Sequence, residues 1–202
     1  SYYAFGKTPV SVQSIYETVT ANPLVTWETA KTWNIGFSSQ FLNGKLGLDL
    51  DYFQSNRNDI LITRNASIPT YSGLSLPAEN LGKVKNHGFE AIATYRDSKG
   101  DFEWGVTGNV TYAKNEVVYA DEAADTPAWQ RETGHPIDGG TYYKALGIYQ
   151  TQEQIESTPH LSGTKIGDLI YQDTNKDGNI TWDDAVRRDK SATPKWIFGL
   201  TL

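Results

Sequence analysis

The chain has no cysteine, so it can form neither disulfides nor a thiolate metal site, and a large core or a membrane must stabilise it. It also lacks any apolar run of about 18 residues, which argues against a membrane-spanning helix. Lysine and arginine form no stripe and the net charge is −6, so nucleic acid is not an expected partner. The sequence has neither HExxH nor GxSxG, and its three histidines are scattered. We therefore predict no catalytic residue and no enzymatic activity.

Aromatic residues and glycine are abundant instead. Aromatics make up 12% of the 202 residues and glycine occurs 18 times, a composition that favours strands and turns. The N-terminal region 6–28 shows no sustained period and contains two prolines, which predicts a loop leading into the first long strand.

The clearest local pattern is a β-hairpin over residues 27–52. Asn43-Gly44, a preferred dipeptide of the two-residue type I′ turn, lies between two alternating runs. A turn at this point would pair Phe37 with Leu50 and Ile35 with Tyr52 on one side of the sheet. That face then collects the apolar side chains of both arms, which are Trp33, Ile35, Phe37, Phe41, Leu46, Leu48, Leu50 and Tyr52.

Alternation returns in three later segments, so the predicted strands are 30–42, 45–57, 84–96, 102–114 and 195–202. The predicted connections are short at Asn43-Gly44 and at 96–101, but long over 60–82 and over 115–194. Outer-membrane barrels sort short turns and long outer loops in this way, and they place apolar side chains toward lipid. The sequence therefore favours an all-β fold of antiparallel strands from a large transmembrane barrel with long extracellular loops.

Both ends of the chain lie inside strand-like aromatic runs, at Ser1 and at Leu202. Natural termini are usually polar and loose. We therefore expect both ends to be internal points of a longer polypeptide.

A calcium-type loop spans residues 173–184 within the predicted outer loop. Its oxygen-bearing residues follow the spacing of an EF-hand loop, with Gly178 at the sharp bend, and hard oxygen ligands at this spacing suit Ca²⁺. The predicted metal residues are Asp173, Asn175, Asp177, Asn179 and Asp184, with Asn179 acting through its backbone carbonyl. The flanks lack the paired helices of a calcium sensor, which predicts a fixed structural ion. The alternative is a polar turn that needs no metal.

Two other groups are weaker candidates. Asp49 and Asp51 share a face and are candidates for a carboxylate pair in acid–base catalysis. However, the wet wall of a barrel carries such carboxylates routinely. Aromatic residues of the outer loop could stack on sugar rings, although ordinary packing accounts for them as well; they are Trp129, Tyr142, Tyr143 and Tyr149.

An ordered set of short motifs gives the chain a family resemblance. The motifs are Asn22-Pro23, Thr26-Trp27-Glu28-Thr29, Trp33-Asn34-Ile35-Gly36, Asp51-Tyr52-Phe53, Asp59-Ile60-Leu61, Asn80-Leu81-Gly82-Lys83-Val84-Lys85-Asn86, Gly88-Phe89-Glu90, Gly147-Ile148-Tyr149, Gly167-Asp168 and Tyr171. With the 173–184 loop, they resemble the C-terminal half of the barrel in the SusC/RagA family of TonB-dependent outer-membrane transporters. Residues 185–193 are only loosely similar to the family.

The resemblance implies a 22-stranded, plugged barrel in the outer membrane of a Gram-negative bacterium of the Bacteroidetes type. Such a barrel takes up glycan or peptide fragments with energy from TonB, and a SusD-like surface lipoprotein covers its outer loops. Residues 1–202 would be one part of this barrel, in contact with outer-membrane lipid, with the rest of the barrel and with a plug that the sequence lacks. The plug-bearing N-terminal part would contact TonB, and the family allows a dimer of transporter–lipoprotein pairs. Inward-facing residues would line the lumen or touch the plug, namely Asp49, Asp51, Glu90, Glu103 and Asn109.

A secreted all-β module that binds glycans and is stabilised by calcium is the alternative function. It predicts that Trp33, Phe37, Trp104 and Val106 are buried in a core of the chain's own.

Overall fold

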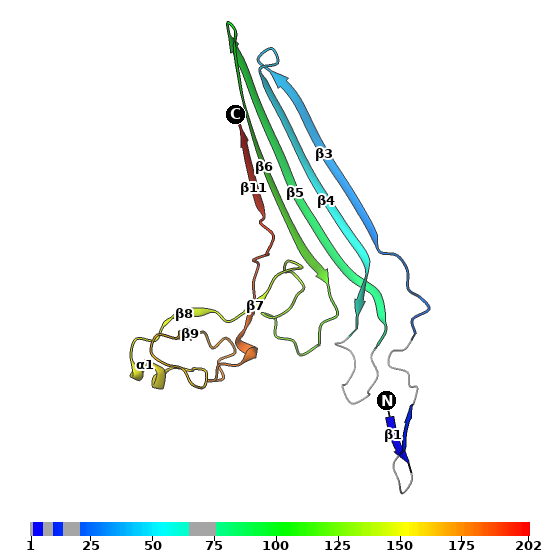
Figure 1. Ribbon diagram of the computed structural model, residues 1–202, viewed down its shortest axis with the longest axis vertical. Coiled ribbons are helices and arrows are strands. Elements are labelled where there is room, and N and C mark those ends of the chain that lie inside the picture. The colour runs from blue at the N-terminus through cyan, green and yellow to red at the C-terminus, as the bar shows by residue number, and fades with distance from the viewer. Residues whose placement is uncertain (1, 6–9, 14–20, 65–75) are drawn as a thin grey trace.

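The computed structural model describes residues 2–5, 10–13, 21–64 and 76–202. Its main feature is a five-stranded antiparallel sheet in the spatial order β11-β6-β5-β4-β3 (Figure 1). The strands are β3 (Thr29–Phe41), β4 (Leu46–Thr63), β5 (Ala78–Lys99), β6 (Phe102–Tyr119) and β11 (Trp196–Thr201). Each strand lies beside its neighbour in sequence, and β11 returns to β6 after a long outer segment.

Strands β4, β5 and β6 are longer than the sequence pattern predicts. β4 and β5 pair as far as Thr63 and Ala78, so the predicted irregular segment 60–82 is wrong at both of its ends. Residues 65–75 of that segment lie outside the described residues. A register shift between Arg57 and Ile60 breaks the alternation there, and Asp59 adopts a positive φ of 58°. Backbone pairing continues past this bulge although the side-chain pattern does not, which explains the error.

The hairpin register agrees with the prediction, since Phe37 pairs with Leu50 and Ile35 with Tyr52. The turn agrees with the predicted type I′ as well, because Asn43 and Gly44 have positive φ of 55° and 84° and the amide of Lys45 donates to the carbonyl of Leu42 at 3.3 Å. Leu42 also has positive φ, and strand pairing ends at Phe41 and Leu46. At the same end of the sheet, β5 and β6 are joined by Gly100 and Asp101 alone, a shorter turn than the predicted 96–101.

The apolar face of the sheet has no cover within the described residues. Phe37 is 52% exposed and Trp104 44% exposed, and Trp33 also lies open. Val106 is half-buried. The alternative of a module with these side chains in its own core does not fit this sheet. Among the described residues, no helix is both long and apolar enough to cross a membrane.

Two smaller parts complete the chain. Near the N-terminus, β1 (Tyr2–Phe5) pairs with β2 (Val10–Gln13), so the segment predicted as a loop contains a short strand. The rest of that predicted loop lies partly outside the described residues.

Between β6 and β11, the outer segment folds around small elements of its own. They are β7 (Thr141–Tyr142), β8 (Ala145–Ile148), α1 (Gln152–Ser157), β9 (Leu169–Tyr171), η2 (Trp182–Asp184) and β10 (Val186–Arg187). β7 pairs with β10, and β8 pairs with β9. The segment projects sideways from one end of the sheet (Figure 1).

Candidate functional site

The polar face of the sheet brings together side chains from four strands. In one cross-strand row Asp51 lies between Gly36 and Glu90, and in the next row Asp49 lies between Ser38 and Ile92. Asn109 follows Ile92 in this second row. The predicted inward-facing residues therefore do share a face, and Glu103 lies further along it, opposite Ser98 near the short turns. Like charges directly opposite each other are unfavourable unless water screens them, so Asp51 beside Glu90 favours a wet environment for this face.

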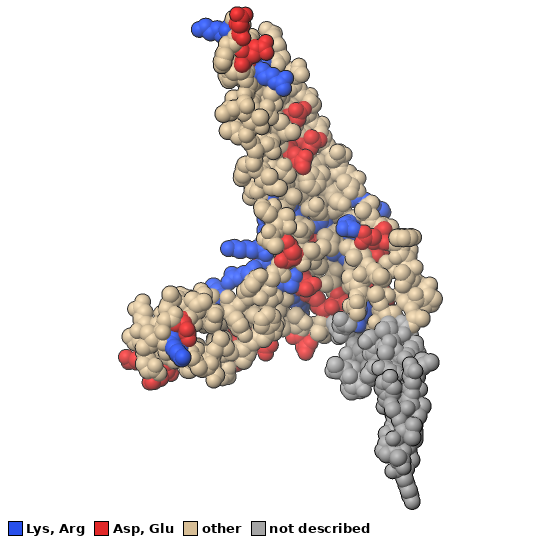
Figure 2. Space-filling view, in the orientation of Figure 1, with Lys and Arg blue, Asp and Glu red and all other residues tan. Residues whose placement is uncertain are grey.

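Charged side chains gather mainly at the two ends of the sheet. In the view of Figure 2, the surface between these ends is mostly uncharged and carries only a small acidic group. No three His, Cys, Asp or Glu side chains within the described residues are grouped to hold a metal ion by themselves. The acidic residues of the polar face thus form no metal centre of that kind.

Glycine allows close packing on this polar face. A Cβ added at Gly88 would lie 2.1 Å from the backbone oxygen of Tyr112 and 2.7 Å from the ring of Phe53. A Cβ at Gly47 would meet nothing nearer than 3.9 Å. Only the first position therefore requires a residue without a side chain.

A small core holds the outer segment together. Tyr149, Ile155, Ile180 and Ala185 are buried, and they come from both halves of the segment. The hydroxyl of Tyr149 donates to the carbonyl of Pro159 at 3.2 Å, and burial raises the pKa of that phenol. Thr151 caps the N-terminus of α1, because its side chain accepts from the amide of Gln154.

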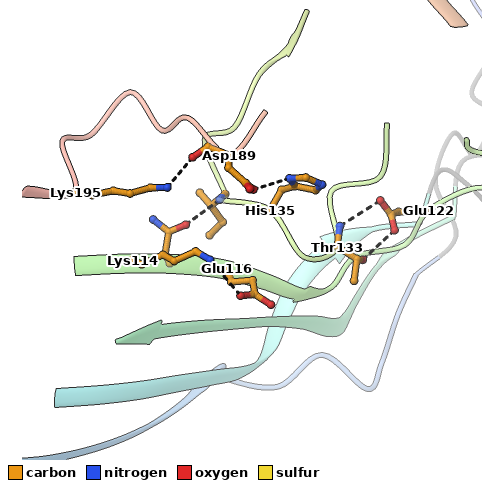
Figure 3. A network of polar contacts seen from close by, with 9 residues as sticks. Lys114, Glu116, Glu122, Thr133, His135, Asp189 and Lys195 are labelled. Carbon is orange, nitrogen blue, oxygen red and sulfur yellow. Dashed lines mark hydrogen bonds and ion pairs between the residues drawn. The ribbon is translucent and has the colours of Figure 1, made fainter. Parts of the chain in front are cut away.

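A polar network fixes the outer segment to the end of β6 (Figure 3). The imidazole Nδ1 of His135 lies 2.9 Å from Asp189 Oδ1, and Lys195 Nζ donates to the carbonyl of Asp189 at 2.7 Å. His135 is itself attached to β6, since its carbonyl accepts from the amide of Val117 at 2.9 Å. Across the same junction, Arg187 pairs with Glu132 at 3.2 Å.

Asp138 closes a turn within this junction. Its carboxylate accepts from the hydroxyl of Ser191 at 2.6 Å and from the amides of Ala192 and Thr193 at 3.1 and 3.3 Å. The Ser191 hydrogen bond is the main cause that lowers the pKa of Asp138. The turn leads directly into β11, so it sets where the chain re-enters the sheet.

The predicted metal residues lie on one compact loop. Asp173 Oδ2 accepts from the amide of Gly178 at 2.9 Å, and Asn175 Oδ1 accepts from the amide of Asp177 at 3.0 Å. Asp177 Oδ1 accepts in turn from the amide of Asn179 at 2.8 Å. Each of these side chains thus holds the backbone that follows it in a tight turn.

Asp184 joins the two ends of this loop and is fully buried, with 0% of its surface exposed. Its Oδ1 accepts from the amides of Thr174 and Asn175 at 2.7 and 3.3 Å, and its Oδ2 accepts from the amide of Thr181 at 2.8 Å. Burial by itself raises the pKa of Asp184, but the hydrogen bonds from Thr181, Asn175 and Thr174 outweigh it and lower the pKa. This carboxylate is therefore held as the anion.

The donor set suits a hard cation in part. Asp173, Asn175 and Asp177 supply side-chain oxygens at alternate positions, as a calcium loop requires. The buried Asp184 adds a further negative charge to the loop. Asp184 already uses both of its oxygens on backbone amides, so a cation would share these oxygens with the loop.

Aromatic side chains of the outer segment mostly pack within it. Tyr143 contacts Tyr171 and Trp182, with ring centroids 5.1 and 6.1 Å apart. Trp129 Nε1 donates to the carbonyl of Asp183 at 2.8 Å. Tyr142 is 60% exposed and is free to contact a ligand. Of the four aromatics singled out in the sequence, three are thus engaged in packing or hydrogen bonds.

Sequence reasoning missed two features of this region. Asp138 lies far from the residues that it binds, so no local motif marks it. The lysines at the outer end of the apolar face also escaped notice, because only cross-strand register brings Lys31 and Lys85 into one row.

Comparison with known proteins assigns the chain to a family of β-barrels. Residues 1–199 match the sequence profile of the family described as TonB dependent receptor-like, beta-barrel. The chain is 28% identical over 190 residues to the TonB-dependent receptor P26 of Formosa agariphila, which covers 89% of this chain and 19% of the relative. It is 27% identical over 185 residues to the TonB-dependent receptor SusC of Bacteroides thetaiotaomicron, covering 89% of this chain and 18% of SusC. The chain thus spans about a fifth of the length of these curated relatives.

Solved structures share the fold. The RagAB peptide transporter superposes with a TM-score of 0.64 at 20% identity, covering 99% of this chain and 21% of the other. The RagAB peptide importer in its open-open state gives a TM-score of 0.66 at 19% identity, with coverage of 99% and 21%. At this identity the likeness establishes the fold of the sheet and its outer segment.

Proposed function

Because the chain belongs to the TonB-dependent receptor-like β-barrel family, we propose that its five long strands form part of the wall of an outer-membrane importer. The apolar face contacts lipid, and the polar face with Asp49, Asp51 and Glu90 borders the water-filled lumen or the plug. The importer resides in the outer membrane of a Gram-negative bacterium of the Bacteroidetes type, as a barrel of 22 strands. No residue of this chain has a catalytic role in the proposal.

The observation that carries this proposal is an apolar face that is continuous across all five strands and has no cover among the described residues. The row Phe37, Leu50, Ala91, Val110 and Phe198 crosses the sheet from one edge to the other. Phe198 is 73% exposed. At about 25 cal/mol per Å² of apolar surface, leaving such side chains in water would forfeit much of the stability of a sheet that lacks a second layer. Lipid supplies the missing layer.

Cargo and partners follow the family. We propose import of glycan or peptide fragments with energy from TonB, and a SusD-like lipoprotein that covers the outer segment. RagAB is a peptide transporter, which supports peptide fragments as cargo, and SusC is a TonB-dependent receptor, which supports the use of TonB. We also propose that the 173–184 loop holds a structural Ca²⁺, supported by its alternating oxygen ligands.

Thiol labelling in outer-membrane vesicles tests the wall. The chain has no cysteine, so Phe37→Cys, Ser38→Cys, Val110→Cys and Asn109→Cys each add the only thiol in this region. We expect a water-soluble maleimide to label the two polar-face positions, and a lipid-soluble maleimide to label the two apolar-face positions. Protection of the apolar-face thiols from both reagents would show that protein covers this face, and the transporter wall would be the wrong assignment.

A further inference from the structure

The apolar face of the sheet changes from aromatic to charged side chains at the end where the long loops lie. The last aromatic row contains Tyr52, Phe89, Tyr112 and Trp196, whose rings lie close together, for example at 4.7 Å between Tyr112 and Trp196. Rows of this kind mark the interface between hydrocarbon and headgroups in membrane barrels. Side chains in the next rows toward the long loops therefore lie at the level of the lipid headgroups.

Those next rows carry a cationic patch, which we define as Lys31, Lys85 and Lys114. Strand alternation places all three on the same side as the aromatic row: Lys31 is two residues from Trp33, Lys85 is four from Phe89, and Lys114 is two from Tyr112. Register puts Lys31, Asn56, Lys85 and Glu116 in one row, and Trp33, Gln54, His87 and Lys114 in the row beside it.

The patch is incompletely neutralised by the protein. Among the described residues, Lys31 and Lys85 have no ion-pair partner, and Lys114 reaches Glu116 only at 3.9 Å. The short-turn end differs, because Lys45 there is paired with Asp97 at 2.5 Å.

We propose that this patch binds the phosphate-bearing headgroup of an outer-leaflet lipid. Adjacent strands lie about 4.8 Å apart, so the three lysines span about 14 Å between β3 and β6, and their flexible stems can converge on one headgroup. Charge complementarity selects an anionic group, and continuity with the aromatic row selects a lipid. This inference rests on the proposed membrane position of the sheet, but it goes beyond the transport function.

Native mass spectrometry of the full-length protein in detergent provides the test, with diphosphorylated lipid A, its dephosphorylated form and inorganic phosphate as probes. A lysine near an anionic surface is worth about fivefold in affinity, so Lys31→Gln with Lys85→Gln and Lys114→Gln should weaken binding of the phosphorylated lipid by on the order of 100-fold. The dephosphorylated lipid should not distinguish the variant from the unmodified protein.

Two controls make the result specific. A triple variant with the same loss of charge, Lys99→Gln with Lys165→Gln and Lys190→Gln, should bind within about twofold of the unmodified protein, since these exposed lysines lie elsewhere. Glu116→Gln should bind about fivefold more tightly, because it removes the anion beside Lys114. A variant that folds poorly would not gain affinity, so this gain excludes misfolding as the explanation.

Several results would overturn the inference. They are unchanged binding in the patch variant, an equal loss in the control triple, no preference for the phosphorylated lipid, or full displacement by millimolar inorganic phosphate. Absence of the unmodified protein from the outer membrane would overturn the proposed transport function as well, whereas charge-independent lipid binding by an inserted barrel would overturn this inference alone.

Discussion

Removing the carboxylate of Asp184 should open the 173–184 loop without disturbing the main sheet. In Asp184→Ala, the amides of Thr174, Asn175 and Thr181 lose their acceptor in a buried site. A buried donor left unsatisfied costs about 1–3 kcal/mol, so three of them cost roughly 3–9 kcal/mol before water enters. Because the loop lies near the surface and water can reach part of it, we expect the lower end, about 3–5 kcal/mol.

Hydrogen exchange measured by mass spectrometry on the full-length protein checks this magnitude. Exchange of a peptide that covers the loop should accelerate by more than about 100-fold in Asp184→Ala, because 1.4 kcal/mol corresponds to about tenfold. The matched control is Asp183→Ala. The carboxylate of Asp183 is exposed, so its removal should change exchange of the same peptide by less than about threefold. The variant Asp184→Asn keeps the shape of the side chain but only one acceptor oxygen, so its exchange should be intermediate between the unmodified protein and Asp184→Ala. Equal exchange in Asp184→Ala and Asp183→Ala would show that the Asp184 carboxylate does not hold the loop closed.

Three further predictions follow from other parts of the chain. Asp138 has a lowered pKa in the folded protein, so the stability that it contributes is present above the unfolded carboxyl pKa of about 4 and is lost as the pH falls through the folded value. Hydrogen exchange of the turn that Asp138 closes should therefore accelerate only in acid. The variant Asp138→Asn should remove this pH dependence. If the outer loop holds calcium, a chelator should speed its proteolysis in the unmodified protein but not in Asp173→Ala with Asp177→Ala, and equal resistance with and without chelator would count against the ion. Gly88→Ala should destabilise the folded sheet by about 1–3 kcal/mol in urea titrations, because its Cβ collides with a backbone oxygen, while Gly47→Ala should change stability by less than about 0.5 kcal/mol.

The main sheet was largely predictable because its information is local. Alternation with a period of two, together with the turn at Asn43-Gly44, fixes which residues face each other, and Phe37 does pair with Leu50. Prediction failed where the bulge between Arg57 and Ile60 shifts the alternation by a residue while the backbone ladder continues. Side-chain pattern follows the face of a strand, whereas strand length follows backbone pairing, and only the first is written in the local sequence.

The outer segment was less predictable, because its contacts join residues far apart in the chain. Local chemistry did mark the 173–184 loop, through the spacing of its oxygen-bearing residues. The pairing of β7 with β10 connects Tyr142 to Val186, and no periodicity in either two-residue strand announces it. The cationic patch belongs to the same class, since each lysine is unremarkable alone and gains meaning only from the register of its strand.

The position of the outer segment is set by the sheet rather than by the segment's own small core. The segment leaves β6 after Tyr119 and returns at Trp196, and both points lie at the same end of adjacent strands. Hydrogen bonds of His135 to β6 and of Lys195 to Asp189 then tie the segment to both strands. These two neighbouring attachments restrain the segment relative to the sheet. If these strands form a barrel wall, the segment is therefore restrained at the mouth of the barrel.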